Sequence, residues 1–127
     1  MDIELILAWP PSVNSYYSHT KRGVFLSGKG RQYRKLVENA VNEQLAGLET
    51  VEDGVLAEVI LHPPDKRKRD IDNHMKGLLD ALTNAQVWED DSQVHQLMIY
   101  RGAVQSGGVC IVRISEAGPI IPIVSRG

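Results

Sequence analysis

The spacing of hydrophobic and polar residues changes several times along the chain and divides it into elements. Apolar residues at positions 3, 5 and 7 predict a β-strand that ends at Trp9-Pro10-Pro11. Residues 12–26 are expected to form a loop, with room for a short strand at 24–26. A helical period then extends to about Leu45, with Ser27 as its N-cap and Gly47 as its stop.

The second half of the chain shows the same changes of period. β-Branched residues predict a strand over 55–62, which the two following prolines end. Apolar residues at i, i+4, i+7, i+8 and i+11 predict a helix over 71–84. Two further strands, over 94–101 and 109–115, flank a pair of glycines and are predicted to form a hairpin.

This order of elements, β(β)αβαββ, predicts an α+β fold. We expect a small single domain over residues 1–116, in which two main helices pack on a mixed β-sheet. The tail, residues 117–127, is apolar but is broken by Pro119 and Pro122. It is a dimer arm, a packed extension or a disordered end.

The composition is that of an ordinary globular domain. The chain has 127 residues, 43% hydrophobic and 24% charged, which excludes disordered and fibrous classes. The single cysteine, Cys110, excludes a disulfide framework and fits a reducing compartment. No apolar run approaches the roughly 18 residues of a membrane span, and the N-terminus lacks the features of a signal peptide. We therefore expect a cytoplasmic protein with no membrane partner.

The formal net charge of −2 hides an uneven distribution of charge. Most basic residues lie in two stretches, between positions 21 and 35 and between positions 66 and 76, while acidic residues dominate elsewhere. A nearly neutral chain can therefore carry a positive face that attracts phosphates. The alternative is that these short runs are only solvated loops.

The second basic stretch is the most informative segment, because carboxylates interrupt it. The run Lys66–Arg69 is followed by Asp70 and Asp72 where the predicted helix begins, and Asp90-Asp91 follows that helix. If Asp70 precedes the first turn, its side chain and that of Asp72 can converge on a hard cation such as Mg²⁺ or Mn²⁺, with a third carboxylate from the later pair. They can equally be helix caps, and the later pair a solvated turn.

Lys76 lies one helical turn after Asp72. Its amine is placed to stabilise negative charge developing on a phosphate or to orient an attacking water. The basic run would hold a phosphodiester backbone against the acidic centre. Asp80, one turn beyond Lys76, is expected to pair with that amine.

Several separate motifs, in the same order, resemble the RusA family of Holliday junction resolvases, small endonucleases of bacteria and their phages. The resemblance covers residues 3–116. It is carried by Trp9-Pro10-Pro11-Ser12-Val13-Asn14 with Tyr16-Tyr17, by Arg67-Lys68-Arg69-Asp70-Ile71-Asp72-Asn73, by Lys76, by Asp80-Ala81-Leu82 and by Val87-Trp88 with Asp90-Asp91. Val13, where members often carry a polar residue, and the long tail depart from the family pattern.

The resemblance implies a Mg²⁺-dependent homodimer, with Mn²⁺ as a substitute and no organic cofactor, that cuts two opposing strands of a four-way DNA junction in recombination and repair. It implies that Asp70, Asp72 and Asp91 are catalytic and bind the metal, and that Lys76 is catalytic. The expected DNA-binding residues are Lys66, Arg67, Lys68, Arg69 and Asn73. A nuclease of flaps, forks or other branched DNA, and a junction-binding protein with little catalysis, are the alternatives.

Other residues with chemical potential have simpler interpretations. Trp9 and the two tyrosines are expected to pack the 12–26 segment onto the core, although aromatic faces can also stack on unpaired bases. The histidines lack the spacing of zinc ligands and are expected to be structural. Cys110 is expected to be a small core residue.

Overall fold

The computed structural model describes residues 2–124 and contains a four-stranded and a two-stranded sheet, three α-helices and two short 3₁₀ helices, η1 and η2. In chain order the elements are β1 (Asp2–Ala8), α1 (Val13–Tyr16), β2 (Tyr17–Thr20), β3 (Gly23–Leu26), α2 (Gly28–Gln44), β4 (Val55–His62), η1 (Ile71–His74), α3 (Met75–Asn84), η2 (Asp91–Gln93), β5 (Val94–Arg101) and β6 (Val109–Glu116). The predicted α+β class is confirmed.

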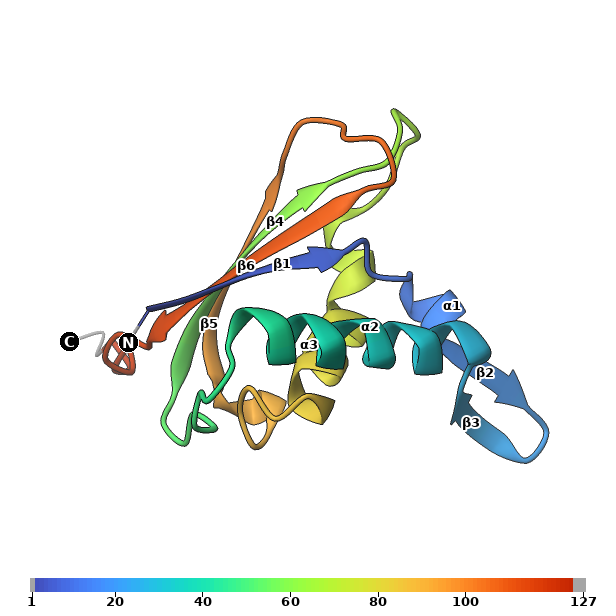
Figure 1. Cartoon of the computed structure of the whole chain (residues 1–127). Coiled ribbons are helices and arrows are strands. Elements are labelled where there is room, and N and C mark those ends of the chain that lie inside the picture. Colours follow the sequence, from blue (N-terminus) through green and yellow to red (C-terminus); the bar gives the residue numbers. More distant parts are fainter. Residues whose placement is uncertain (1, 125–127) are drawn as a thin grey trace.

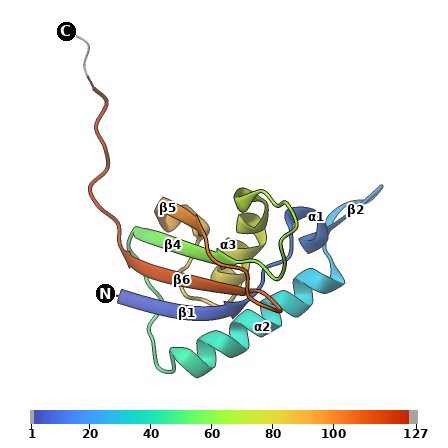
Figure 2. The same ribbon diagram turned by 90° about the horizontal axis from the view of Figure 1, so that it is seen from above.

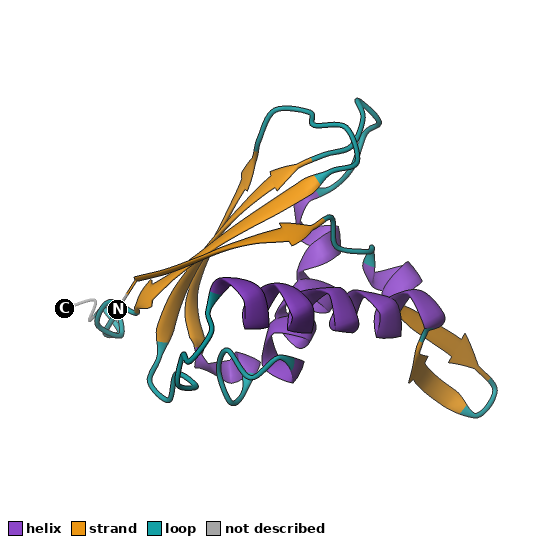
Figure 3. Ribbon diagram, viewed as in Figure 1, coloured by secondary structure: helices purple, strands orange, loops and turns teal. Residues whose placement is uncertain are grey.

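The larger sheet is mixed, as expected. Its strand order is β1-β6-β4-β5, with β6 antiparallel to both of its neighbours and β5 parallel to β4. The helices α2 and α3 cover one face of this sheet (Figures 1 and 3). The other sheet, the β2–β3 hairpin, projects away from the domain beside the start of α2 (Figure 1).

The predicted hairpin between the last two strands is wrong. β4 lies between β5 and β6 and pairs with both of them. All four inward-facing residues of β4 are buried, as expected for a strand with a neighbour on each side. The glycine pair does form a turn, because Gly107 and Gly108 both have positive φ, but the chain passes over the end of β4 before it returns. A sequence pattern indicates two nearby strands and a turn; it does not indicate which strands pair.

Residues 12–26 are more regular than expected. They form the single turn α1 and the β2–β3 hairpin instead of a loop with one short strand. The start of α2 agrees with its prediction, because the Ser27 side chain accepts a hydrogen bond of 2.9 Å from the amide of Gly30. This cap satisfies one of the free amides of the first helical turn.

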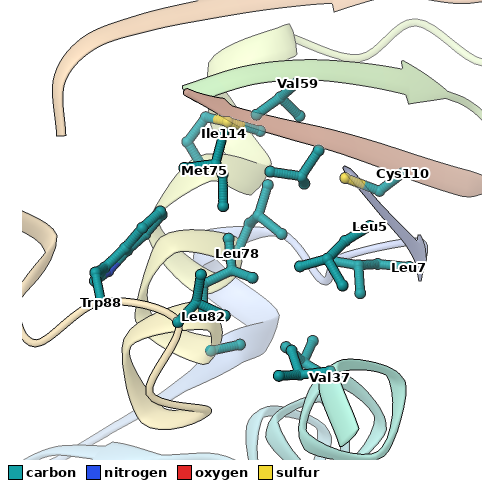
Figure 4. Packing of buried hydrophobic residues seen from close by; sticks show 14 of the residues in the cluster. Leu5, Leu7, Val37, Val59, Met75, Leu78, Leu82, Trp88, Cys110 and Ile114 are labelled. Carbon is teal, nitrogen blue, oxygen red and sulfur yellow. The ribbon is translucent and has the colours of Figure 1, made fainter. Parts of the chain in front are cut away.

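The core lies between the sheet and the two long helices. Figure 4 shows Val37 of α2 and Leu78 and Leu82 of α3 pointing toward Leu5 and Leu7 of β1. All five side chains are at most 3% exposed.

Cys110 faces the core, as predicted, and burial raises the pKa of its thiol to about 12. The segment 117–124 leaves the domain after β6 (Figure 2). Its first two residues remain attached to the domain, because the Ala117 amide donates to the Gly54 carbonyl oxygen at 3.1 Å and the Gly118 amide donates to Gln96 Oε1 at 2.9 Å. Beyond them the apolar side chains are 82–98% exposed, so residues 120–124 are not packed on their own domain. The last three residues of the predicted tail lie outside the described residues.

Candidate functional site

The predicted carboxylates Asp70 and Asp72 lie where the chain leaves the basic loop and enters η1. Asp70 has extended backbone angles, φ −80° and ψ 132°, and its side chain makes no capping hydrogen bond. Asp72 follows in the first turn of η1, and both residues are exposed. Neither carboxylate forms an ion pair among residues 2–124. Asp70 therefore occupies the N-cap position of η1 without capping it through its side chain.

The two residues of the later acidic pair, Asp90 and Asp91, have different environments. The Asp90 carboxylate caps η2 by accepting a hydrogen bond of 2.8 Å from the Ser92 amide, which lowers the pKa of Asp90. Gln93 completes a capping box by accepting from the Asp90 amide at 2.9 Å. Asp91 is exposed and has no ion-pair partner in the described part of the chain. Of the two, Asp91 is the carboxylate available for chemistry.

Lys76 lies in the first turn of α3, one turn after Asp72, and is exposed. It makes no ion pair with any residue from 2 to 124. The expected pairing with Asp80 is wrong, because Asp80 instead accepts from Arg34 at 2.7 Å and from the hydroxyl of Tyr16. Burial, followed by the contact with Asp80, raises the pKa of Tyr16. The Asp80 carboxylate is therefore not available to Lys76.

Over residues 2–124, no group of three Asp, Glu, His or Cys side chains lies close enough to share one metal ion. Asp70, Asp72 and Asp91 are thus not gathered into a three-ligand set. Their chemistry still fits a hard divalent cation, because all three carboxylates are exposed and form no ion pair with residues 2–124. Mg²⁺ in particular is usually held by one or two carboxylates together with water and substrate phosphate.

The basic loop ahead of Asp70 is anchored through Arg69. This guanidinium lies 2.8 Å from the Asp65 carboxylate and stacks on Trp9, with its central carbon 5.7 Å from the ring centroid. Arg69 lowers the pKa of Asp65 to about 2. Trp9 also contacts His74. The two ring centroids are 4.8 Å apart, and His74 Nδ1 lies 2.8 Å from the Pro10 carbonyl oxygen. Arg69, Trp9 and His74 together fix the loop where η1 begins.

The other basic side chains of the loop are exposed. Arg67 is 82% exposed and lies 3.6 Å from Asp65, and Lys66 and Lys68 are exposed as well. Such exposure is expected both of a phosphate-binding surface and of a solvated loop, so the DNA-binding role of these residues stays a prediction. Arg69, at 21% side-chain exposure, differs from them because its guanidinium packs on Trp9 and makes the shorter contact with Asp65, 2.8 Å against 3.6 Å for Arg67.

Arg101, at the end of β5, was not among the residues expected at this site. It lines an open hollow of about 480 Å³ together with Lys68, Arg69, Asp70 and Asn73. The sequence around Arg101 contains no motif that indicates a DNA-binding role, and Arg101 lies in a strand 25 residues after Lys76. Only the parallel pairing of β5 with β4 brings it to the loop that follows β4.

Tyr16, His62 and His74 have structural contacts, as expected. Tyr16 is fully buried, and a side chain on Gly77 would begin 2.8 Å from its ring, so α1 and α3 approach closely at this point. His62 Nδ1 lies 2.9 Å from the carbonyl oxygen of Ala103. His74 is 5% exposed. In the described part of the chain, none of the helices has the length and apolar character needed to cross a membrane.

Comparison with known proteins agrees with these features. The sequence model of the family described as Endodeoxyribonuclease RusA matches residues 8–114. The crossover junction endodeoxyribonuclease of Enterobacteria phage HK97 is 35% identical over 115 residues, which is 91% of this chain and 95% of that protein. The protein of the same name from Escherichia coli K12 is 35% identical over 114 residues, 90% of this chain and 94% of its own. The chain belongs to the RusA family of endodeoxyribonucleases.

Proposed function

We propose that this protein is a divalent-metal-dependent endonuclease that resolves four-way DNA junctions by symmetric paired nicks, in the cytoplasm of a bacterium or a phage-infected cell. One observation carries the proposal. In a RusA-family chain, the exposed carboxylates of Asp70 and Asp72, which form no ion pair within the described residues, border a loop of exposed basic side chains. The basic side chains can then attract DNA phosphates next to carboxylates that can bind a metal ion.

Asp70, Asp72 and Asp91 are the proposed metal-binding and catalytic carboxylates. Their oxygens suit Mg²⁺, with Mn²⁺ as a substitute, and we expect no organic cofactor. When bound, the metal would lower the pKa of a water molecule and stabilise negative charge on the scissile phosphate. The separation of roles at η2 supports Asp91 over Asp90, because the Asp90 carboxylate is already engaged by the Ser92 amide.

The remaining proposed roles belong to cationic and amide side chains. Lys76 would stabilise the charge that develops on the phosphate, because its amine is exposed and lies one turn from Asp72. Lys66, Arg67, Lys68 and Asn73 would engage backbone phosphates. Arg69 would contribute to the same surface mainly by holding the loop on Trp9 and Asp65.

A homodimer fits the proposed reaction. Two equivalent centres related by a two-fold axis match a four-way junction, which has two-fold symmetry of its own. The face of the large sheet opposite the helices carries half-exposed apolar side chains, among them Ile6 at 55%, Met98 at 45% and Tyr100 at 44%. This face is a suitable surface for a second copy.

A junction-cleavage assay tests the proposal directly. The protein is incubated with a four-way junction that has a mobile core, and with a linear duplex of the same sequence, with and without Mg²⁺ or Mn²⁺. We expect metal-dependent paired nicks in the junction and none in the duplex. Faster cutting of flaps or forks would favour a general branched-DNA nuclease. Binding without any nicking in either metal would reject the enzymatic proposal.

The variant Asp72→Asn separates catalysis from binding. It removes one negative charge while it keeps the shape of the side chain, so we expect cleavage to be lost and junction affinity to be kept or increased. A variant that also loses binding would show that Asp72 is needed for folding of the loop instead.

A further inference from the structure

We infer that Arg101 is a further DNA-binding residue, which together with Lys68 forms a binding site for a backbone phosphate in the hollow beside Asp70. This inference rests on the proposed function and adds to it a contact from β5, outside the basic loop. The hollow has a volume of about 480 Å³ and is open to solvent, which is ample for a phosphate group and its hydration water.

The position of Arg101 is fixed by the sheet. Arg101 is the last residue of β5 and pairs with Leu61 of β4 in the parallel ladder. The next residue continues this contact, because the Gly102 amide donates to the Leu61 carbonyl oxygen at 2.7 Å. A side chain on Gly102 would start 2.4 Å from the ring of His62. Glycine at 102 therefore lets the two strand ends stay in close contact, and Arg101 is held against the loop that follows β4.

The guanidinium of Arg101 is oriented but not neutralised. Its Nη2 donates to the Arg69 carbonyl oxygen at 2.8 Å, which uses one of its five N–H donors. Arg101 forms no ion pair with any of the residues that the structure describes. The planar fork thus has donors left for two oxygens of one phosphate, which is the geometry that arginine provides better than lysine.

The charges around the hollow favour an anion. Arg69 is matched by Asp65 at 2.8 Å, so the uncompensated cations of the hollow are Lys68 and Arg101, against the single carboxylate of Asp70. The Asn73 side chain adds an amide donor. A phosphate bound here would lie directly beside Asp70, which is where the proposed reaction requires the DNA backbone.

Salt-dependent binding of a fluorescent four-way junction, measured by anisotropy without a divalent metal, tests this inference. Each phosphate contact contributes about 0.9 to the slope of log affinity against log salt concentration. We expect Arg101→Gln to reduce that slope by about 0.9 and to weaken binding roughly five- to tenfold at 0.1 M salt, and Arg101→Lys to keep the slope. The matched control is Arg113→Gln, because Arg113 is an exposed strand arginine paired with Glu4 at 3.0 Å. It should leave the slope unchanged.

The outcomes distinguish this inference from the proposed function. If wild-type protein cuts junctions in Mg²⁺ and Arg101→Gln keeps the wild-type salt slope, the Arg101 inference is wrong and the proposed function stands. If affinity falls without a change in slope, Arg101 only supports the loop through Arg69, and the inference is again wrong. If Arg101→Gln lowers the slope but wild-type protein never nicks a junction, the phosphate site stands and the resolvase proposal fails. A thermal melt of each variant confirms that it is folded.

Discussion

Replacement of Arg69 by alanine tests whether this residue anchors the basic loop or contacts DNA as a free cation. The variant loses the stacking on Trp9, worth about 0.5–1 kcal/mol at a partly exposed site, and the packing of the methylene stem of a side chain that is 21% exposed. The ion pair with Asp65 is at the surface and is screened by solvent, so it adds little. The total is about 1 kcal/mol, which lowers the melting temperature by roughly 3–6 °C for a domain of this size.

The assay pairs thermal unfolding, followed by circular dichroism, with the salt dependence of junction binding. Arg67→Ala is the matched control from the same loop, because Arg67 is 82% exposed. We expect Arg69→Ala to lower the melting temperature and to weaken binding with little change in slope. Arg67→Ala should leave the melting temperature unchanged and reduce the slope by about 0.9. An unchanged melting temperature for Arg69→Ala, with a slope reduced by that amount, would refute the anchoring role.

Three further predictions concern the rest of the domain. Asp90→Ala should lower the melting temperature at neutral pH, whereas Asp91→Ala should leave the melting temperature unchanged and abolish cleavage. Because the pKa of Asp90 is lowered in the folded protein, its carboxylate stabilises the fold only when ionised. The difference in melting temperature between wild type and Asp90→Ala should therefore be full above about pH 5 and decrease as the pH falls below about 4. Gly77→Ala should cost about 1–3 kcal/mol in a denaturant titration, since the new methyl would meet the Tyr16 ring at 2.8 Å; a cost near zero would mean that α1 shifts freely. The buried Cys110 thiol should react with a thiol reagent only at the rate of unfolding, and fast labelling of folded protein would contradict its burial.

Local features of the site were predictable because they depend on near neighbours in the chain. The helix start at Ser27, the strand 55–62 and the end of extended structure at Asp70 follow from periodicity, capping and proline. The acidic residues were identified from their type and from the basic run beside them. The choice of Asp91 over Asp90 came from the family resemblance alone, and the capping box on Asp90 now offers a physical reason for it.

Contacts between segments that are distant in the sequence could not be predicted from the sequence pattern. The pairing of the last two strands was predicted wrongly, because alternation and a glycine turn do not exclude the insertion of β4 between them. Asp80 was assigned to Lys76 by helical spacing, yet Arg34 lies 46 positions away in the chain and contacts it at 2.7 Å. A contact that close outweighs a solvated pair one turn apart on a helix surface, where the gain is only a few tenths of a kcal/mol.

Local spacing and residue type were enough to predict the two long helices, the four strands of the large sheet, the family and the candidate carboxylates, but not the β2–β3 hairpin. Which of the charged side chains remain without a partner depends on contacts between segments that are distant in the sequence. Arg69 contacts Asp65 and Trp9, and Asp80 contacts Arg34 and Tyr16. Arg101, at the end of β5, lies at the hollow beside Asp70. Periodicity indicates which face of a strand is buried, but it carries no information about the neighbouring strand. Arg101 therefore reaches the site only through the packing of β5 against β4, and Arg34 reaches Asp80 only through the packing of α2 against α3.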